Sequence, residues 1–561
     1  MPTPTAAWAC HPALLTFFIL LLSAAVAGAA GFEPPAFKPD QMGGTLYANF
    51  NAEPQTLNPL TSRDYYAQML QERVLEGLID YDLDSLELVG VLADRWEVSP
   101  DGKVITFHIN PKARFSDGSP VTADDVLFTY ETMRNPEIDA ADMASYFEDC
   151  EKCEKIDNLT VRYTWKKTYF KSLEVSGGML PIIPKHVYQF TEPKKFNDLR
   201  DVVVGSGPYM MKPGDWKTGE HIVLTRNPNY WRNPVAIERV VYRFIKEEQA
   251  SVQALKAGQL DEVPVTPEWW VRLGAEPGFK DRFQMLRYSQ PRNGYVFIGW
   301  NNARWQFKDA RTRRALTQLI WREQLVKYML YDIAQVTSGP FWNKSPQHDR
   351  TVEPWPFDRE AARRLLKEAG WEDRDRDGWL ENAEGKRFEF DMSIPLGNQQ
   401  GRDLMRVIGE EFRRMGIKMN IAPIDWPVFT VRLDNRDFDA VIMAWATTLD
   451  ADPYQIWHSS QIVGRGSNFI GYRNAEADRL IEQARLTLDT GKRNAIFHQF
   501  HRLLHEEQPY TFMWGRESLR IVTNRVKGVK IHRLGLDWRE WWIGKDDGAA
   551  KDSSLAAGGA S

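Results

Sequence analysis

Residues 438–461 read FDAVIMAWATTLDADPYQIWHSSQ, and the rest of the chain is organised around them. The apolar run at 440–445 predicts a buried strand, since a short apolar run that ends in turn residues is typical of one. Asp450 and Asp452 follow in a turn-rich segment, where Asp452 suits the N-cap and Pro453 the first position of a new helix. The two carboxylates therefore either cap a turn and a helix, or lie at a strand end as partners for a cationic ligand group.

Length and composition indicate a large globular protein. A chain of 561 residues is long enough for about two to four domains of typical size. Hydrophobic residues make up 43% and charged residues 26%, which predicts a substantial core. The formal net charge of -5 argues against general nucleic-acid binding.

The N-terminal thirty residues contain no Lys, Arg, Asp or Glu. Residues 12–30 read PALLTFFILLLSAAVAGAA, an apolar core that ends in small residues, and 25–27 (AVA) fit a small-x-small cleavage pattern. The basic residues of a typical signal are missing, and a membrane anchor is the alternative, although the apolar core is short for a span. We expect residues 1–30 to be an export signal and the mature chain to start near 28–31.

Two cysteines, Cys150 and Cys153, remain in the exported chain, in the sequence DCEKC. In an oxidising compartment the pair could form a disulfide, act in redox chemistry or bind metal. No second CxxC completes a zinc site and the context is not thioredoxin-like. The sequence therefore favours a structural disulfide or two idle thiols.

Periodicity divides the chain into two parts near the turn-rich sequence QPRNG at 290–294. Beyond it, helices alternate with apolar runs, which is typical of an α/β arrangement. The tail at 546–561 is rich in Gly, Ala and Ser and is expected to be disordered. Alternating residues predict strands at 44–50 and 159–165, further strands are expected at 240–245 and 295–300, and buried strands are expected at 418–424 and 438–445. Helices are expected at 65–79, 309–330, 360–370, 400–415, 475–488 and 493–507.

An acidic segment at 373–384, DRDRDGWLENAE, resembles an EF-hand calcium loop in spacing. Its ligand positions 1, 3, 5 and 12, with Gly378 at position 6, are Asp373, Asp375, Asp377 and Glu384. A strand-like run follows where an EF-hand has its second helix, and the arginines at 374 and 376 could neutralise the carboxylates. A polar turn is the preferred interpretation, and calcium binding is the alternative.

Catalytic signatures are weak. His498, His501 and His505 share one face of a predicted helix, which fits a core-flanking face better than a metal site. The chain has no G-x-S-x-G motif and no Cys/His pair with recognisable spacing. We therefore expect no cofactor, and an enzyme such as a secreted hydrolase is the weaker hypothesis.

A long motif at 92–126 carries a family resemblance. It reads LADRWEVSPDGKVITFHINPKARFSDGSPVTADDV and resembles the extracellular solute-binding proteins, family 5, of bacterial ABC importers, which include the oligopeptide- and dipeptide-binding proteins. The resemblance covers 43–541, but Trp321 stands where an Asp is usual and the segment after Trp445 is one residue longer than in peptide binders. Further matching stretches are GTLYANFNAEPQTLNP, PIIPKHVY, GSGPYMM, RNPNYW, ALKAGQLD, NNARWQFKDARTRRAL and DADPYQIWHSSQ.

The resemblance implies an α/β, two-lobed periplasmic binding fold. Mixed sheets are flanked by helices, the first lobe carries an extra subdomain, and the ligand lies in the cleft between the lobes. The implied boundaries are a signal peptide at 1–30, lobe 1 at 31–292 with a subdomain at roughly 60–200, lobe 2 at 293–515, a return to lobe 1 at 516–545, and the disordered tail.

The resemblance also implies a function and a site. The protein would capture a peptide in the periplasm by closure of two lobes and deliver it to a membrane permease. Asp450, or Asp452 as second choice, would receive the ligand's α-ammonium, and Arg402 would meet a ligand carboxylate. The main chain of the ligand would pair with Ala444, Trp445 and Ala446.

The partners implied are a peptide or other small molecule and an ABC transporter permease, with a monomeric chain and no nucleic acid. A nickel chelate, an oligosaccharide or a modified peptide is the alternative ligand on the same fold. Hypotheses from other classes are the secreted hydrolase and a calcium-dependent structural protein.

Overall fold

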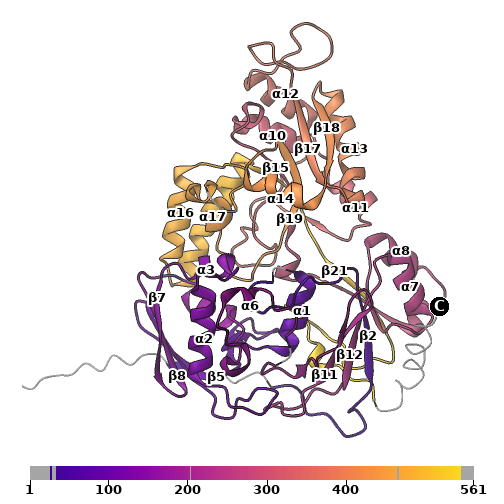
Figure 1. Cartoon of the computed structure of the whole chain (residues 1–561). Helices are drawn as coiled ribbons and strands as arrows, with labels where there is room; N and C mark the ends of the chain where they lie inside the picture. Colours follow the sequence, from indigo (N-terminus) through magenta and orange to yellow (C-terminus); the bar gives the residue numbers. More distant parts are fainter. Residues whose placement is uncertain (1–25, 28–32, 63, 203, 464–465, 545–561) are drawn as a thin grey trace, which may run out of the picture.

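The computed structural model describes residues 26–27, 33–62, 64–202, 204–463 and 466–544. The expected disordered tail, and the expected signal peptide apart from Val26–Ala27, lie outside these residues. Within the described ranges, three large sheets organise the molecule (Figure 1). No helix among the described residues is long and apolar enough to cross a membrane.

An eight-stranded mixed sheet is built around β2 (Thr45–Phe50), all six residues of which are buried. A strand without an exposed face is typical of the middle of a sheet that is covered on both sides. It runs parallel to its two neighbours, β12 and β13. The strand order is β10 (Trp216–Lys217), β11 (His221–Arg226), β12 (Arg239–Phe244), β2, β13 (Glu262–Pro264), β21 (Ser518–Thr523) and β14 (Phe283–Tyr288), and β9 (Tyr209–Met210) pairs with β11.

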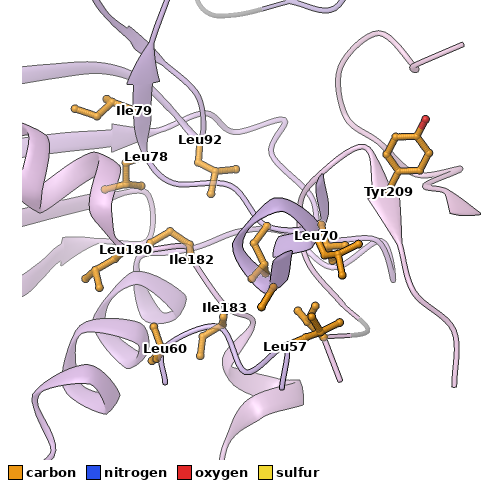
Figure 2. Packing of buried hydrophobic residues seen from close by; sticks show 14 of the residues in the cluster. Leu57, Leu60, Leu70, Leu78, Ile79, Leu92, Leu180, Ile182, Ile183 and Tyr209 are labelled. Carbon is orange, nitrogen blue, oxygen red and sulfur yellow. The ribbon is translucent and has the colours of Figure 1, made fainter. Parts of the chain in front are cut away.

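A five-stranded antiparallel sheet lies beside it and shares its hydrophobic core. Figure 2 shows part of this core, in which Leu70, Leu78 and Ile183 come together from separate segments. At the start of helix α2 (Ala123–Arg134), Thr122 and Asp125 form a capping box. The strand order is β1 (Val26–Ala27), β5 (Ala93–Val98), β6 (Val104–Ile109), β8 (Thr160–Trp165) and β7 (Cys150–Asp157).

A six-stranded mixed sheet forms the other half of the molecule (Figure 1). Its order is β16 (Gln335–Val336), β20 (Tyr510–Gly515), β15 (Tyr295–Trp300), β19 (Ala440–Trp445), β17 (Glu389–Pro395) and β18 (Lys418–Ile424). The helices of this half are α10 (Ala310–Gln318), α11 (Arg322–Met329), α12 (Arg359–Glu368), α13 (Gln399–Arg414), α14 (Trp426–Asp434), α16 (Ala475–Arg485) and α17 (Thr490–Glu507). We call the part built on this sheet the second lobe and the part built on the other two sheets the first lobe.

The chain crosses between the lobes twice, on neighbouring strands. In the first lobe β14 and β21 are antiparallel partners, with Tyr288 opposite Ser518. In the second lobe β15 and β20 are also antiparallel partners, with Tyr295 opposite Gly515. The two connecting segments, 289–294 and 516–517, therefore begin and end side by side, and we call them the hinge. The finer domain boundaries given above stay predictions.

Two predicted helices differ in the structure. The helix expected at 65–79 is α1 (Tyr65–Val74), and it ends because the Val74 carbonyl accepts a hydrogen bond from Gly207 N at 2.9 Å instead of continuing the helix. The single helix expected at 309–330 is two, α10 and α11. The second begins at Arg322, whose buried guanidinium donates to the carbonyl of Phe512 at 2.6 Å and so turns the chain into the core.

Cys150 and Cys153 are buried free thiols on β7. Three residues of extended chain span roughly 10 Å, beyond the Cα separation that a disulfide bridges. Of the two interpretations favoured by the sequence, the structure therefore contains the idle thiols.

Candidate functional site between the lobes

Strand β19 ends at the edge of the second-lobe sheet that faces the first lobe. It pairs with β15 along its whole length, from Ala440 opposite Trp300 to Trp445 opposite Tyr295. On its other side β17 pairs with it only at Ala440 and Val441. Among the described residues, no strand is paired with this edge of β19 at 442–445, which is the arrangement that accepts an added extended peptide.

The end of this strand is held against the hinge. Gly294 adopts a positive φ of 59°, and a Cβ atom there would lie 1.6 Å from the carbonyl oxygen of Trp445. Only glycine allows this approach of the two backbones. The Trp445 ring lies parallel to Phe297 and Phe469, with centroids 6.2 and 5.9 Å away, and its Nε1 donates to Tyr510 Oη at 3.3 Å. Both the backbone and the ring of Trp445, the last residue of β19, are therefore held in place.

Asp450 lies at the surface between the lobes and already has protein partners. Its carboxylate pairs with Arg493 at 2.8 Å and accepts a hydrogen bond from Gln347 Nε2 at 2.8 Å. Burial raises the pKa of Asp450 above its ordinary value, against the opposing effect of Arg493 and Lys171. The side chain remains 28% exposed, so it keeps an accessible side.

Asp452 is more deeply buried, with 8% of its side chain exposed. Its Oδ2 accepts from the Tyr169 hydroxyl at 2.9 Å and pairs with Arg485 Nε at 3.0 Å, and its Oδ1 accepts from Tyr454 N at 3.1 Å. The last contact is a turn between Asp452 and the first residue of the next helix, and the prediction that Asp452 is the N-cap of this helix is wrong, because Pro453 takes that position. The helix, α15 (Tyr454–Trp457), starts one residue later than predicted, with Pro453 at the cap position, not at the first helical position.

Asp450, through its backbone carbonyl, and Asp452, through its carboxylate, take part in a direct contact between the lobes. From the first lobe, Lys171 Nζ donates to the Asp450 carbonyl at 2.7 Å, and Phe170 N donates to the Arg485 carbonyl at 2.9 Å. The Tyr169–Asp452 hydrogen bond belongs to the same contact. We call Tyr169, Phe170, Lys171, Asp450, Asp452 and Arg485 the lobe latch.

Lys171 is the buried charge at the centre of the lobe latch, with 4% of its side chain exposed. It pairs with Glu174 at 2.9 Å, and Glu174 in turn accepts from the Tyr81 hydroxyl at 2.8 Å. Burial alone lowers the pKa of the Lys171 ammonium, but Glu174, Asp450 and Asp452 outweigh burial and raise it. Lys171 therefore stays charged at neutral pH, and the stability that it contributes is lost only at a pH above its ordinary range.

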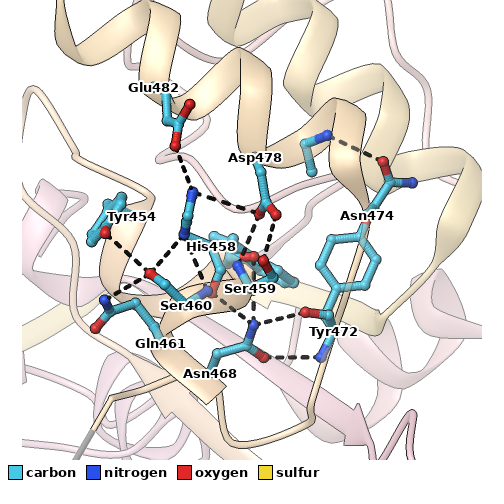
Figure 3. A network of polar contacts seen from close by, with 12 residues as sticks. Tyr454, His458, Ser459, Ser460, Gln461, Asn468, Tyr472, Asn474, Asp478 and Glu482 are labelled. Atoms are coloured by element: carbon cyan, nitrogen blue, oxygen red, sulfur yellow. Dashed lines mark hydrogen bonds and ion pairs between the residues drawn. The ribbon is translucent and has the colours of Figure 1, made fainter. Parts of the chain in front are cut away.

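A polar network positions the segment that follows Asp452 (Figure 3). Asp478 on α16 accepts from the backbone N–H of Ser459 at 2.8 Å and also from its hydroxyl at 2.5 Å. Asn468 donates to the carbonyls of His458 and Tyr472 at 3.2 and 2.9 Å. Because α16 also carries Arg485, this network fixes the carboxylate-bearing segment and its cationic partner to one helix.

Arg402 lies in the first turns of α13, which follows the end of β17. It donates to the carbonyl of Leu396 and, at 2.6 Å, to the side chain of Gln399. Strands β17 and β19 are parallel, so Arg402 follows the strand end that lies at the same sheet edge as Trp445. Its role toward a ligand stays a prediction.

The histidine face on α17 points into the second lobe and its surface. His501 is fully buried, its Nε2 lies 3.1 Å from Ser338 Oγ, and its Nδ1 accepts from Asp349 N at 3.1 Å. Burial lowers the pKa of His501 to about 3. His505 stacks on Trp355 at a centroid distance of 4.9 Å. The His501 ring therefore packs inside the second lobe, with both of its nitrogens next to hydrogen-bonding groups of the protein.

The predicted twelfth position of the acidic loop is corrected by the structure. Glu384 is exposed and pairs with Lys386 at 2.8 Å, which lowers the pKa of Glu384. It is not among the carboxylates that gather in this loop, which are Asp373, Asp375, Asp377 and Glu381.

Sequence reasoning missed the first-lobe half of the site. Tyr169 and Lys171 lie in a short segment, KTYFKSLE, that has no motif of its own. The sequence also did not indicate Gln347 and Arg493 of the second lobe, because nothing around a single Gln or a helical Arg shows which residue it contacts. A surface hollow of about 740 Å³, lined among others by Phe37, Lys527 and Trp542, lies on the first lobe away from these residues.

The two lobes, the adjacent hinge strands and the open strand edge between them define a two-lobed solute-binding protein. Comparison with known proteins agrees. Residues 87–465 match the model of the bacterial extracellular solute-binding proteins, family 5 (middle region), and the chain belongs to this family.

Two relatives extend the match over nearly the whole chain. The oligopeptide-binding protein AppA of Bacillus subtilis is 29% identical over 548 residues, which cover 95% of this chain and 97% of AppA. The solved structure of that AppA in complex with a nonapeptide has a TM-score of 0.77 at 27% identity, covering 90% of this chain and all of that one. NikZ of Campylobacter jejuni, solved with Ni(L-His), has a TM-score of 0.76 at 24% identity, covering 90% and 100%, and shows the fold.

Proposed function

We propose that this protein is a secreted, non-enzymatic receptor that captures peptides between its lobes and delivers them to the permease of an ABC importer. The observation that carries the proposal is the open edge of β19, which ends among groups that join the two lobes. The full-length similarity to an oligopeptide-binding protein solved with a peptide supports the same ligand class. We further propose that the chain acts as a periplasmic monomer after removal of residues 1–30.

The edge of β19 provides sequence-tolerant binding. Its residues Ala444 and Ala446 are exposed, while the Trp445 ring is held by aromatic neighbours. A peptide added beside this edge would exchange main-chain hydrogen bonds with it, and such bonds do not depend on the ligand's side chains. Small residues at 444 and 446 leave room for varied ligand side chains next to the strand.

Asp450 is the better of the two candidate partners for a ligand's α-ammonium. Asp452 is 8% exposed and takes three contacts, whereas Asp450 is 28% exposed and takes two contacts on its carboxylate. A carboxylate has about four lone-pair positions, so Asp450 can accept one more donor. A charge-assisted hydrogen bond there would fix the register of the peptide without reading its sequence.

The experiment is a calorimetric titration with di- to pentapeptides, each as the free amine and as the N-acetylated form. We expect the free peptides to bind and acetylation to weaken binding, with most of that preference lost in Asp450→Asn. The matched control is Asp489→Asn, which changes a helix cap of α17 instead. Equal affinity for free and acetylated peptides would refute the role of Asp450. Binding of Ni(L-His) or an oligosaccharide, and of no peptide, would refute the ligand class.

A further inference from the structure

The acidic loop of the second lobe joins α12 to β17 and is clamped at its base. Glu372 and Glu381 form an antiparallel bridge, with backbone hydrogen bonds of 3.0 and 2.9 Å. Just outside this bridge, Trp371 stacks on Phe388 at a centroid distance of 4.1 Å. The two ends of the loop are therefore fixed by the core, and its carboxylates are brought together by the fold.

Four carboxylates converge in this loop. One oxygen from each of Asp373, Asp375, Asp377 and Glu381 lies within 4.8 Å of the others. Like charges at this spacing repel one another, and the three aspartates are exposed. Exposed acidic groups gather in many loops, so this spacing alone does not identify a site.

Glu381 provides a second and independent observation. It is 4% exposed, and its Oε2 accepts from Arg374 N at 2.9 Å. Its Oε1 is buried and has no hydrogen-bond partner within the part of the chain that the structure describes. A buried carboxylate oxygen without a partner is costly, and a bound cation would provide the missing partner.

Within the described residues, one cation is paired with a carboxylate of the cluster. Arg387 pairs with Asp377. The guanidinium of Arg374 turns away to the carbonyl of Asn382, at 3.1 Å, and lies near Glu372. Asp373, Asp375 and Glu381 form no ion pair within the described residues.

We propose that Asp373, Asp375, Asp377 and Glu381 bind one Ca²⁺ ion. Oxygen-only ligands in an adaptable coordination geometry are typical of calcium. Four oxygens that lie within 4.8 Å of one another can each stand about 2.3–2.6 Å from one central ion, which is the bond length of Ca²⁺. The ion would tie the tip of the loop to its buried base at Glu381.

Calorimetric titration of CaCl₂ into the purified, EDTA-treated and dialysed protein tests the site. We expect one site per chain, with an affinity in the range of about 10⁻⁴–10⁻³ M that is common in extracellular modules. Glu381→Gln and Asp375→Asn should each weaken binding by about 10- to 100-fold. Asp375 is exposed, so its variant keeps the fold if the Glu381 variant does not.

Glu384→Gln is the matched control, because Glu384 lies three residues from Glu381 and outside the cluster. It should bind Ca²⁺ like the parent protein. The absence of binding at about 10 mM CaCl₂, far above this affinity range, would overturn the proposal. Equal loss of affinity in the Glu384 and Asp375 variants would also overturn it.

Discussion

Removal of one hydroxyl, in Tyr169→Phe, should shift the protein toward an open state. The hydroxyl donates to Asp452 across the lobes at 2.9 Å, and Asp452 is buried. A hydrogen bond to a charged group contributes about 1.5–3 kcal/mol. Because Asp452 keeps Arg485 and Tyr454 N as partners, we expect the lower part of this range, about 1.5–2 kcal/mol, or roughly 10- to 30-fold in the ratio of closed to open molecules.

Single-molecule fluorescence transfer between one dye on each lobe measures this ratio directly. The apparent dissociation constant of a peptide that binds the closed state should rise by no more than the same factor. Tyr454→Phe is the matched control, because the Tyr454 hydroxyl bonds to Ser460 Oγ at 3.0 Å within the second lobe. A Tyr169→Phe protein that closes like the parent, or a Tyr454→Phe protein that opens equally, would refute the reasoning. A double-mutant cycle that combines Tyr169→Phe with Asp452→Asn measures the interaction free energy between these two side chains.

Three further predictions concern the hinge and two histidines. Gly294→Ala should lower the melting temperature and weaken peptide binding, because its Cβ would collide with the Trp445 carbonyl; unchanged values for both would contradict this. Burial lowers the pKa of His532, but hydrogen bonds to the carboxylates of Asp84 and Glu540 outweigh burial and raise it. The stability that the charged ring contributes is therefore present below about pH 6.5 and is lost as the pH rises. His532→Gln should flatten the resulting fall in melting temperature between about pH 6 and 8. The pKa of His501, lowered to about 3, means that its folded ring stays neutral at pH 5; ¹⁵N spectra of labelled histidines, with His501→Gln for assignment, should show a neutral ring.

Much of the fold could be predicted from local features of the sequence. Strands at 295–300 and 418–424 begin and end at the predicted residues, since apolar runs between turns or helices mark them. The capping box at Thr122 and the turn contact of Asp452 with Tyr454 N are also local. The end of α1 at Val74 was missed, because it depends on a hydrogen bond from Gly207, far along the chain.

The candidate site, like the fold, could be predicted from the sequence only in part. Asp450 and Asp452 could be singled out from their position after an apolar strand. Their partners Tyr169 and Lys171 come from about 280 positions earlier, and nothing in a helix-and-strand pattern indicates which distant segments meet. Family resemblance supplied the lobes and the cleft, but it gave no indication that the same aspartates would join the lobes.

The paired crossing strands make the second lobe an insertion in one hairpin of the first. Tyr295 and Gly515 are directly opposite each other, and so are Tyr288 and Ser518. A short turn between β14 and β21 could therefore replace the whole of 295–515 without moving either strand, because chain ends this close tolerate excision and insertion. The gene for such a protein could arise by placing one folding unit into a loop of another, and each unit could be exchanged with that of a relative.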